Sequence, residues 1–367
     1  MLAVYTDDAV IADALAFETA LAHAQLDAGL VTEEQAKAII TACASLVFDP
    51  ATLASEVALA GTLAIPLVKR LRETLPAELA ALAHRGATSQ DVADTVMVLQ
   101  ARRALTLLEI DVARILKGLS GLATRHAQTP AIGRTLLQDA MPIGFGLRIA
   151  HWHAAIAEAM SRLEKDVEDH ARVQLGGAAG TRADLGGAGA LVATRMAGLL
   201  GLADGAPWHG RRMGVSAIGT SLAMLIGALG KMARDISLLS QNAIGEAREP
   251  AIAGRGGSSA MAHKCNPTGC QIALAAAHRA PGLAATLLSG LPQEEERGLG
   301  GWQAEAPALA DLFMIAAGSA DAMAIVAEGL IVDEAAIARN LHSATTSVDI
   351  GESVKLTQDL LQMNGND

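Results

Sequence analysis

Residues Gly254 to Pro267 read G-R-G-G-S-S-A-M-A-H-K-C-N-P, a stretch that predicts a loop ending in a helix. Its three glycines can take backbone angles that other residues avoid, so they permit a sharp path and movement. We expect Asn266 to cap the helix and Pro267 to be its first residue. The unpaired N–H groups and the dipole of a helix N-terminus favour an anion, and a carboxylate is the expected guest. The polar side chains nearest in sequence are Ser258, Ser259 and Lys264.

The composition of the chain is typical of packed helices. Apolar residues make up 51% of the 367 residues but aromatic residues only 2%, so small aliphatic side chains must fill the interior. A chain of this length exceeds a typical single core, which indicates two or more domains or one elongated bundle. We interpret the positive mean hydropathy of +0.33 as helix surface buried between subunits.

Apolar residues recur at steps of three and four along five long segments, the spacing of bundle helices. These segments run from Ser89 past Leu119, and roughly over Gly144–Val173, Gly214–Ala247, Asn266–Leu288 and Ala306–Gly329. Two shorter helices are predicted on either side of Gly29, the second starting with a capping box at Thr32 and Gln35. No segment shows sustained alternation of apolar and polar residues, so we expect no sheet. The predicted fold class is all-α.

One uncharged segment, Met213–Gly230, has the length of a membrane span. Serine and threonine dilute it, and its apolar stripe continues past Lys231 at heptad spacing, which favours a bundle seam over lipid. The sequence at Met1 lacks the charged and apolar regions of a secretory signal. We therefore expect neither membrane insertion nor secretion.

The net charge and the cysteine residues exclude several classes of binding partner. The formal net charge of −11 argues against nucleic acid and against an anionic membrane surface. The three cysteines lack the spacing of a metal site, and reduced thiols in the cytoplasm are expected. Basic residues nevertheless lie in or beside the motifs, which predicts a local pocket for small anions: Arg85, Arg134, Arg255, Lys264 and Arg297.

Three further motifs accompany the loop. They are H-R-G-A-T-S-Q-D-V-A-D-T at His84–Thr95, G-R-T-L-L-Q-D-A-M-P at Gly133–Pro142, and Q-E-E-E-R-G-L-G-G-W-Q-A-E at Gln293–Glu305. With the loop, these four motifs resemble, in order, those of the fumarase/aspartase superfamily. The last motif is most similar to that of the superfamily's 3-carboxy-cis,cis-muconate cycloisomerases. The loop departs from the superfamily signature at Ala262, where a proline is usual, and Cys265 fills a variable position.

The resemblance implies a long-helix bundle of the fumarase/aspartase type, with a central five-helix bundle shared in a homotetramer whose sites combine motifs from several subunits. It divides the chain into an N-terminal helical domain at 1–107, a central long-helix bundle domain at 108–332, and a remnant of a shortened C-terminal domain at 333–367.

The resemblance also assigns roles to the motif residues. Ser258 is expected to transfer a proton, helped by positive potential from Lys264 and the helix end at Asn266. Hydroxyl, amide and guanidinium groups suit the carboxylates of a small polycarboxylate substrate. The expected substrate-binding residues are His84, Arg85, Thr88, Ser89, Arg134, Thr135, Gln138, Ser259, Met261, Glu296 and Arg297. Each of them taken alone has an ordinary structural alternative, such as a helix cap or a surface ion pair.

Leu136 stands where fumarase and argininosuccinate lyase have their general-acid histidine. Because leucine cannot transfer a proton, the reaction should expel or add a group that is stable as an anion, such as a carboxylate. This favours the cycloisomerisation of 3-carboxy-cis,cis-muconate, a step of aromatic catabolism. The alternatives are a superfamily lyase that eliminates fumarate or a related anion, and a catalytically silent helical scaffold. Intact Ser258, Lys264 and Asn266 weigh against the scaffold.

Neither a metal nor a cofactor is expected. His151 and His153 are two residues apart on a predicted helix, so they point to different faces and cannot hold one ion together. Lys264 is followed by Cys265, and the chain contains no G-x-x-x-x-G-K-S/T phosphate loop.

Overall fold

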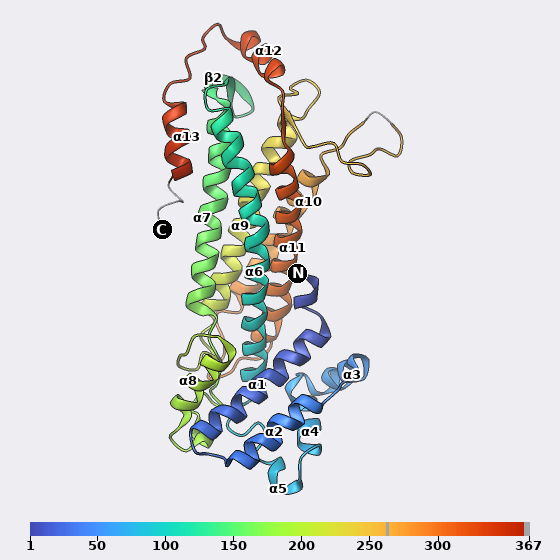
Figure 1. The fold of residues 1–367 in the computed structure, drawn as a ribbon, viewed down its shortest axis with the longest axis vertical. Helices are drawn as coiled ribbons and strands as arrows, with labels where there is room; N and C mark the ends of the chain where they lie inside the picture. The colour runs from blue at the N-terminus through green and yellow to red at the C-terminus, as the bar shows by residue number, and fades with distance from the viewer. Residues whose placement is uncertain (262–263, 363–367) are drawn as a thin grey trace. The chain divides into compact units, whose positions relative to one another are not determined.

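The computed structural model describes residues 1–261 and 264–362, and most of them are helical (Figure 1). The chain forms two compact units, each built from three separate segments. The first unit comprises Met1–Leu105, Lys165–Gly219 and Ala285–Asp311, and the second comprises Thr106–Glu164, Thr220–Ala284 and Leu312–Asp367. The expected domain boundaries after residues 107 and 332 cut the sequence into consecutive pieces, and they stay a prediction.

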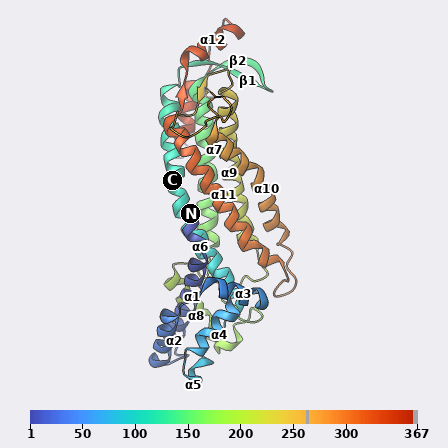
Figure 2. The ribbon, with the colours of Figure 1, turned by 90° about the vertical axis from the view of Figure 1, so that its right-hand side faces the viewer.

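Short helices build much of the first unit. They are α1 (Asp7–Asp27), α2 (Glu33–Ser45), α3 (Pro50–Ala60), α4 (Ala64–Glu73), α5 (Ala77–Ala80) and α8 (Gly189–Leu200), with 3₁₀ turns at Leu2–Val4 and Ala183–Leu185. The side chain of Thr32 accepts from the Gln35 amide, and the Gln35 side chain accepts from the Thr32 amide, so the predicted capping box at the start of α2 is confirmed. Helix α1 packs against α2 and α8 (Figures 1 and 2).

Five long helices confirm the predicted pattern. They are α6 (Ser89–Arg125), α7 (Phe145–His170), α9 (Met213–Leu239), α10 (Thr268–Ser289) and α11 (Gly301–Gly329). Their parts in the second unit run side by side as a bundle (Figures 1 and 2). The interior is aliphatic, as the composition predicted: Ile115, Leu119, Ile149, Leu229 and Met323 are among its fully buried side chains. Helix α9 ends eight residues earlier than expected.

By length and composition alone, α9 and α11 are apolar enough to cross a membrane. In the most apolar windows of these helices, 56% and 61% of the residues are already buried inside the protein. The bundle therefore covers the larger part of each apolar stripe, as the heptad spacing predicted for α9.

Two short antiparallel pairings show that the expectation of no sheet is wrong. Strand β1 (Pro130–Thr135) pairs with β2 (Gln138–Gly144), and β3 (Ala247–Arg248) pairs with β4 (Ile331–Val332). Three consecutive residues of β1 are buried, and the register shifts between Ile132 and Arg134, so no alternation marks this strand in the sequence. The strands β3 and β4 have two residues each, too few for a periodic signal.

The last helices belong to the second unit. Helix α12 (Glu334–Ala344) begins at Asp333, whose side chain accepts a hydrogen bond from the Ala336 amide. Helix α12 contacts β1, and α13 (Ser353–Gln362) contacts β2.

Candidate active site

The glycine-rich loop is held by its own polar groups. The Ser258 hydroxyl oxygen accepts from the amides of Ala260, at 3.3 Å, and Met261, at 3.1 Å. The amide of Lys264 donates to the Met261 carbonyl at 3.1 Å. The side chains of Ser259, Met261 and Lys264 are exposed, and Ser258 is half-buried. The loop therefore offers hydroxyl groups and one ammonium group to a ligand, while Ala262 lies outside the described residues.

Asn266 closes the loop instead of capping the helix. Its side-chain amide donates to the Gly257 carbonyl at 3.2 Å, and its backbone amide donates to the Gly256 carbonyl at 2.7 Å. Gly256 has a φ of +75°, and a side chain there would meet the Asn266 carbonyl at 2.6 Å. Only glycine fits this close approach.

The cap of α10 is Glu249, so the expectation of an Asn266 cap is wrong. The Glu249 carboxylate accepts from the amides of Gly269, at 3.0 Å, and Cys270, at 2.7 Å. Helix α10 starts at Thr268, one residue later than expected. The negative charge of Glu249 offsets the positive end of the helix dipole. Lys264 is therefore a stronger source of positive potential in this loop than the N-terminus of α10.

The guanidinium group of Arg134 is bound inside the second unit. It donates to both oxygens of Glu246, at 2.6 and 3.1 Å, and lies 3.3 Å from Asp139. Glu246 is fully buried and also accepts from Asn340 at 2.8 Å. Hydrogen bonding to Glu246 raises the pKa of Arg134 above its usual range. Arg134 therefore pairs with a carboxylate of the protein, which leaves fewer of its N–H groups free to bind a substrate.

The β1–β2 hairpin carries three other predicted positions at its tip. Thr135 and Gln138 face each other across a two-residue turn made by Leu136 and Leu137. Both leucines have left-handed backbone angles, with φ of 51° and 64°, which is a strained conformation for leucine. Leu136 is 96% exposed, and Met141 on the returning strand is exposed as well. The position that holds the general acid in the lyases therefore lies at an exposed apolar tip.

In the first unit, a cavity of about 670 Å³ brings predicted residues together. His84, Thr88 and Ser89 line it with Lys69, Arg72 and Glu73, so the lining includes cationic side chains, hydroxyl groups and one carboxylate. Arg85 points elsewhere: its guanidinium donates to the Leu30 carbonyl at 2.9 Å. The cavity has the size and the donors for a small polycarboxylate.

Arg297 joins two of the motifs in the first unit. Its guanidinium donates to the hydroxyl oxygens of Thr88, at 2.7 Å, and of Ser89, at 3.5 Å. The Thr88 amide donates to Asp91 at 2.9 Å, which fixes the start of α6. Glu296, beside Arg297, is exposed and contributes to none of these contacts.

A buried ionic cluster, which the sequence analysis missed, links the same two motifs. Arg212, 1% exposed, donates to both oxygens of Asp94 at 2.8 Å and to both oxygens of Glu305. Burial raises the pKa of Glu305 above its usual range, although Arg212 opposes this rise. Asp94 and Glu305 stand inside the motifs, but Arg212 belongs to none, so no sequence signal pointed to it.

Asp91 anchors the glycine-rich connection between α7 and α8. Its carboxylate accepts from the amides of Gly176 and Gly177, both at 2.9 Å, and bonds His209 Nε2 at 2.7 Å. Asp91 was expected only to complement the helix dipole at the start of α6, and it also positions this connection.

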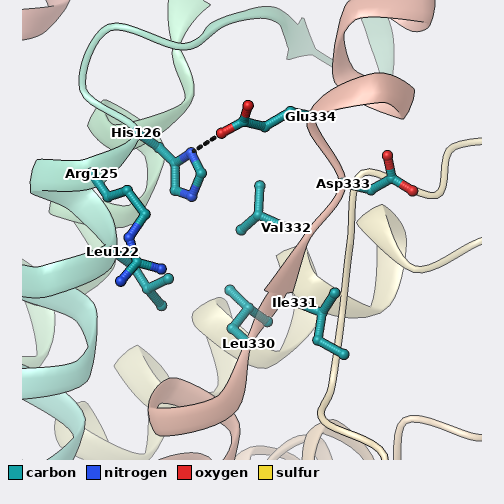
Figure 3. A pocket seen from close by; sticks show the side chains of 8 residues that line it. All are labelled: Leu122, Arg125, His126, Leu330, Ile331, Val332, Asp333 and Glu334. Atoms are coloured by element: carbon teal, nitrogen blue, oxygen red, sulfur yellow. Dashed lines mark ion pairs between the residues drawn. The ribbon is translucent and has the colours of Figure 1, made fainter.

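A second cavity, of about 430 Å³, lies in the second unit where α6 ends beside β4 and α12 (Figure 3). His126 Nδ1 lies 3.3 Å from Glu334 across its rim, and Leu122, Leu330 and Val332 form apolar parts of the wall (Figure 3). The cavity contains none of the predicted site residues. Within residues 1–261 and 264–362, no group of three acidic, histidine or cysteine side chains is arranged to hold a metal ion.

The predicted residues are divided between the two units. His84, Thr88, Ser89 and Arg297 lie together in the first unit, and the second holds the hairpin residues and the loop with Ser258, Lys264 and Asn266. Among the predicted arginines, the guanidinium of Arg85 donates to a backbone carbonyl, and that of Arg134 donates to a buried carboxylate.

Comparison with known proteins agrees with the motifs and the fold. Residues 2–282 match the protein family described as Lyase. A 3-carboxy-cis,cis-muconate cycloisomerase of Bradyrhizobium diazoefficiens is 43% identical over 358 residues, covering 96% of this chain and 79% of the relative. A nitrosuccinate lyase of Streptomyces davaonensis is 38% identical over 351 residues, covering 92% of this chain and 74% of the relative.

A solved structure shows the same architecture. The crystal structure of 3-carboxy-cis,cis-muconate lactonizing enzyme from Pseudomonas putida superposes with a TM-score of 0.89 at 38% identity, covering 99% of this chain and 85% of that one. Given similarity over nearly the whole chain in both sequence and fold, this protein belongs to the lyase family of the fumarase/aspartase superfamily.

Proposed function

We propose that this protein converts 3-carboxy-cis,cis-muconate to a carboxymuconolactone. The observation that carries the proposal is the contact of Arg297 with Thr88 and Ser89. This contact joins the motif most similar to the cycloisomerases, at Gln293–Glu305, to Thr88 and Ser89, which line a cavity together with His84. The named cycloisomerase relatives support the same reaction.

In the proposed reaction, an oxygen of one substrate carboxylate forms a bond to a carbon of the conjugated double bond. The electron pair of that double bond moves toward the neighbouring carboxylate, which becomes an aci-acid stabilised by hydrogen bonds and cations. Ser258 then delivers a proton to carbon and regains one from solvent, so the fully protonated product is an isomer of the fully protonated substrate. No leaving group needs a general acid, in keeping with leucine at position 136.

We further propose that the protein is a cytoplasmic homotetramer whose sites combine residues from several copies. The exposed leucines of the hairpin tip and the partly covered stripes of α9 and α11 support self-association over lipid binding. The three free cysteines fit a reducing compartment.

The test is to add the purified protein to 3-carboxy-cis,cis-muconate and follow the loss of its ultraviolet absorbance, with the product identified by mass and NMR. We expect the absorbance to fall and the fully protonated product to have the same mass as the fully protonated substrate, because the reaction is an isomerisation. Release of fumarate from argininosuccinate or adenylosuccinate, without turnover of the muconate, would support the lyase alternative. A folded protein that is inert towards all three substrates would support the scaffold.

A further inference from the structure

A buried carboxylate contacts His84, the histidine that lines the first-unit cavity. Glu18, on α1, is 1% exposed, and its Oε1 lies 2.6 Å from Nδ1 of His84. Its other carboxylate oxygen is also buried and has no hydrogen-bond partner in the described part of the chain. A buried carboxylate is costly without a positive partner, so the pair favours a positively charged His84 ring.

The backbone holds His84 in the orientation that this contact needs. His84 has a left-handed backbone, with φ of 64°, and Gly86 follows with φ of 80°. Arg72 donates to the Ala83 carbonyl at 3.1 Å, just before the turn. A non-glycine residue with this backbone signals a conformation maintained by its surroundings, often for function.

The charged groups around the ring favour its protonated form. Burial alone lowers the pKa of His84, but the charge of Glu18 and its hydrogen bond outweigh burial, with a smaller contribution from Asp91. Arg72 acts in the opposite direction. Lys69 and Glu73 also line the cavity and form an ion pair with each other at 3.9 Å. The net effect is a His84 pKa above its usual range.

We propose that Glu18 is a positioning residue for substrate binding: it fixes the orientation and the positive charge of His84, so that Nε2–H binds a substrate carboxylate in the cavity. With Nδ1–H donated to Glu18, Nε2 is the nitrogen that can reach a ligand. Thr88 and Ser89 supply hydroxyl groups to the lining of the same cavity. The identity of the substrate rests on the proposed function, whereas carboxylate binding by the pair does not.

The experiment measures binding of tricarballylate, an unreactive tricarboxylate, by calorimetry at pH 6 and pH 7.5. The variants are Glu18→Gln, His84→Gln and the double variant. Asp13→Asn is the matched control, because Asp13 is another buried carboxylate on α1 and pairs with Arg103 instead. Thermal unfolding of each variant separates loss of binding from loss of fold.

We expect Glu18→Gln to weaken binding by about tenfold at pH 7.5, the loss expected for a charge-assisted hydrogen bond. The loss should shrink at pH 6, because acid protonates His84 without the help of Glu18. In the His84→Gln background, Glu18→Gln should have no further effect. Asp13→Asn should leave binding unchanged.

Equal weakening at both pH values, or a further loss in the double variant, would mean that Glu18 has only a structural role. If the protein does not turn over 3-carboxymuconate but this binding pattern holds, the proposed function fails and the inference stands. If turnover is found and Glu18→Gln changes neither KM nor tricarballylate affinity, the inference fails alone.

Discussion

The guanidinium group of Arg212 donates to both carboxylate oxygens of Asp94, each at 2.8 Å, although 118 residues separate them in the sequence. Glu305 accepts from the other edge of the same group, and the ring of Trp208 lies 4.7 Å from its central carbon. Helix α6 and helix α11 are thus tied through one buried cation. Thr88 and Arg297 belong to the same two motifs as Asp94 and Glu305. The buried cluster therefore helps to hold these two motifs, and with them the Thr88–Arg297 contact, in place.

Removal of the cation should therefore destabilise the first unit strongly. We expect Arg212→Met to lower the free energy of unfolding by about 3–5 kcal/mol, because two buried carboxylates lose their partner. Urea denaturation followed by circular dichroism measures this change. Arg211→Met is the matched control, since Arg211 is the exposed neighbour and donates to the backbone carbonyls of Ala206 and Pro207. A loss below about 1 kcal/mol for Arg212→Met would contradict the role of the cluster.

The two serines of the loop should differ in their effect on turnover. We expect Ser258→Ala to lower kcat by roughly a hundredfold to ten-thousandfold, as for a lost acid–base group, with little change in affinity. Ser259→Ala should act mainly on KM. Steady-state kinetics with 3-carboxymuconate give both constants, and circular dichroism controls for folding. If Ser259→Ala lowered kcat and Ser258→Ala changed mainly KM, Ser259 would be the proton donor. Full activity in both variants would place the chemistry outside this loop.

The hairpin tip should matter for assembly. Light scattering at micromolar concentration is expected to show a tetramer, and Leu137→Asp should shift it to smaller species, because a charge at an apolar contact is costly to bury. Leu59→Asp is the control: Leu59 is 92% exposed on α3, which belongs to the first unit. A folded wild-type monomer would refute the tetramer. An unchanged tetramer in the Leu137 variant would remove the hairpin from the interface.

His126 should contribute to the pH dependence of stability. Burial lowers the pKa of its ring below the usual value, an effect that Glu334 only partly opposes. The unfolded chain therefore takes up the proton first as the pH falls. The contribution of the neutral ring is present above the unfolded pKa of about 6.5 and is lost at lower pH.

The corresponding measurement compares His126→Gln with wild type in urea at pH 8 and pH 5. The destabilisation by the variant should be smaller at pH 5. His23→Gln, at an exposed position on α1, controls for general effects of losing a histidine. A destabilisation that grows at pH 5 would mean that the ion pair with Glu334 dominates over burial.

The sequence alone predicted the helical class, the five long helices and the capping box at Thr32. These features are local: backbone bonds span four residues, and the apolar stripe repeats every three or four. The motifs also indicated Thr88, Ser89 and Arg297 as residues for a substrate carboxylate, and these three side chains are in contact in the first unit.

The hairpin and the cap of α10 could not be predicted in this way. The turn at Leu136 and Leu137 lacks the glycine or asparagine that usually marks a left-handed turn. Its conformation is imposed by the pairing of the two strands, which the sequence of the turn does not show. Glu249 caps a helix that starts 19 residues later, whereas a sequence search for caps considers only adjacent residues.

The partners of the charged side chains were decided by the tertiary structure alone. Glu18 meets His84 across 66 residues, Arg134 meets Glu246 across 112, and Arg212 meets Glu305 across 93. A motif shows which chemical groups are present, but the packing of helices selects which oppositely charged groups are buried together. Burial in a medium of low polarity then makes each of these pairs strong, and no local pattern in the sequence records that environment.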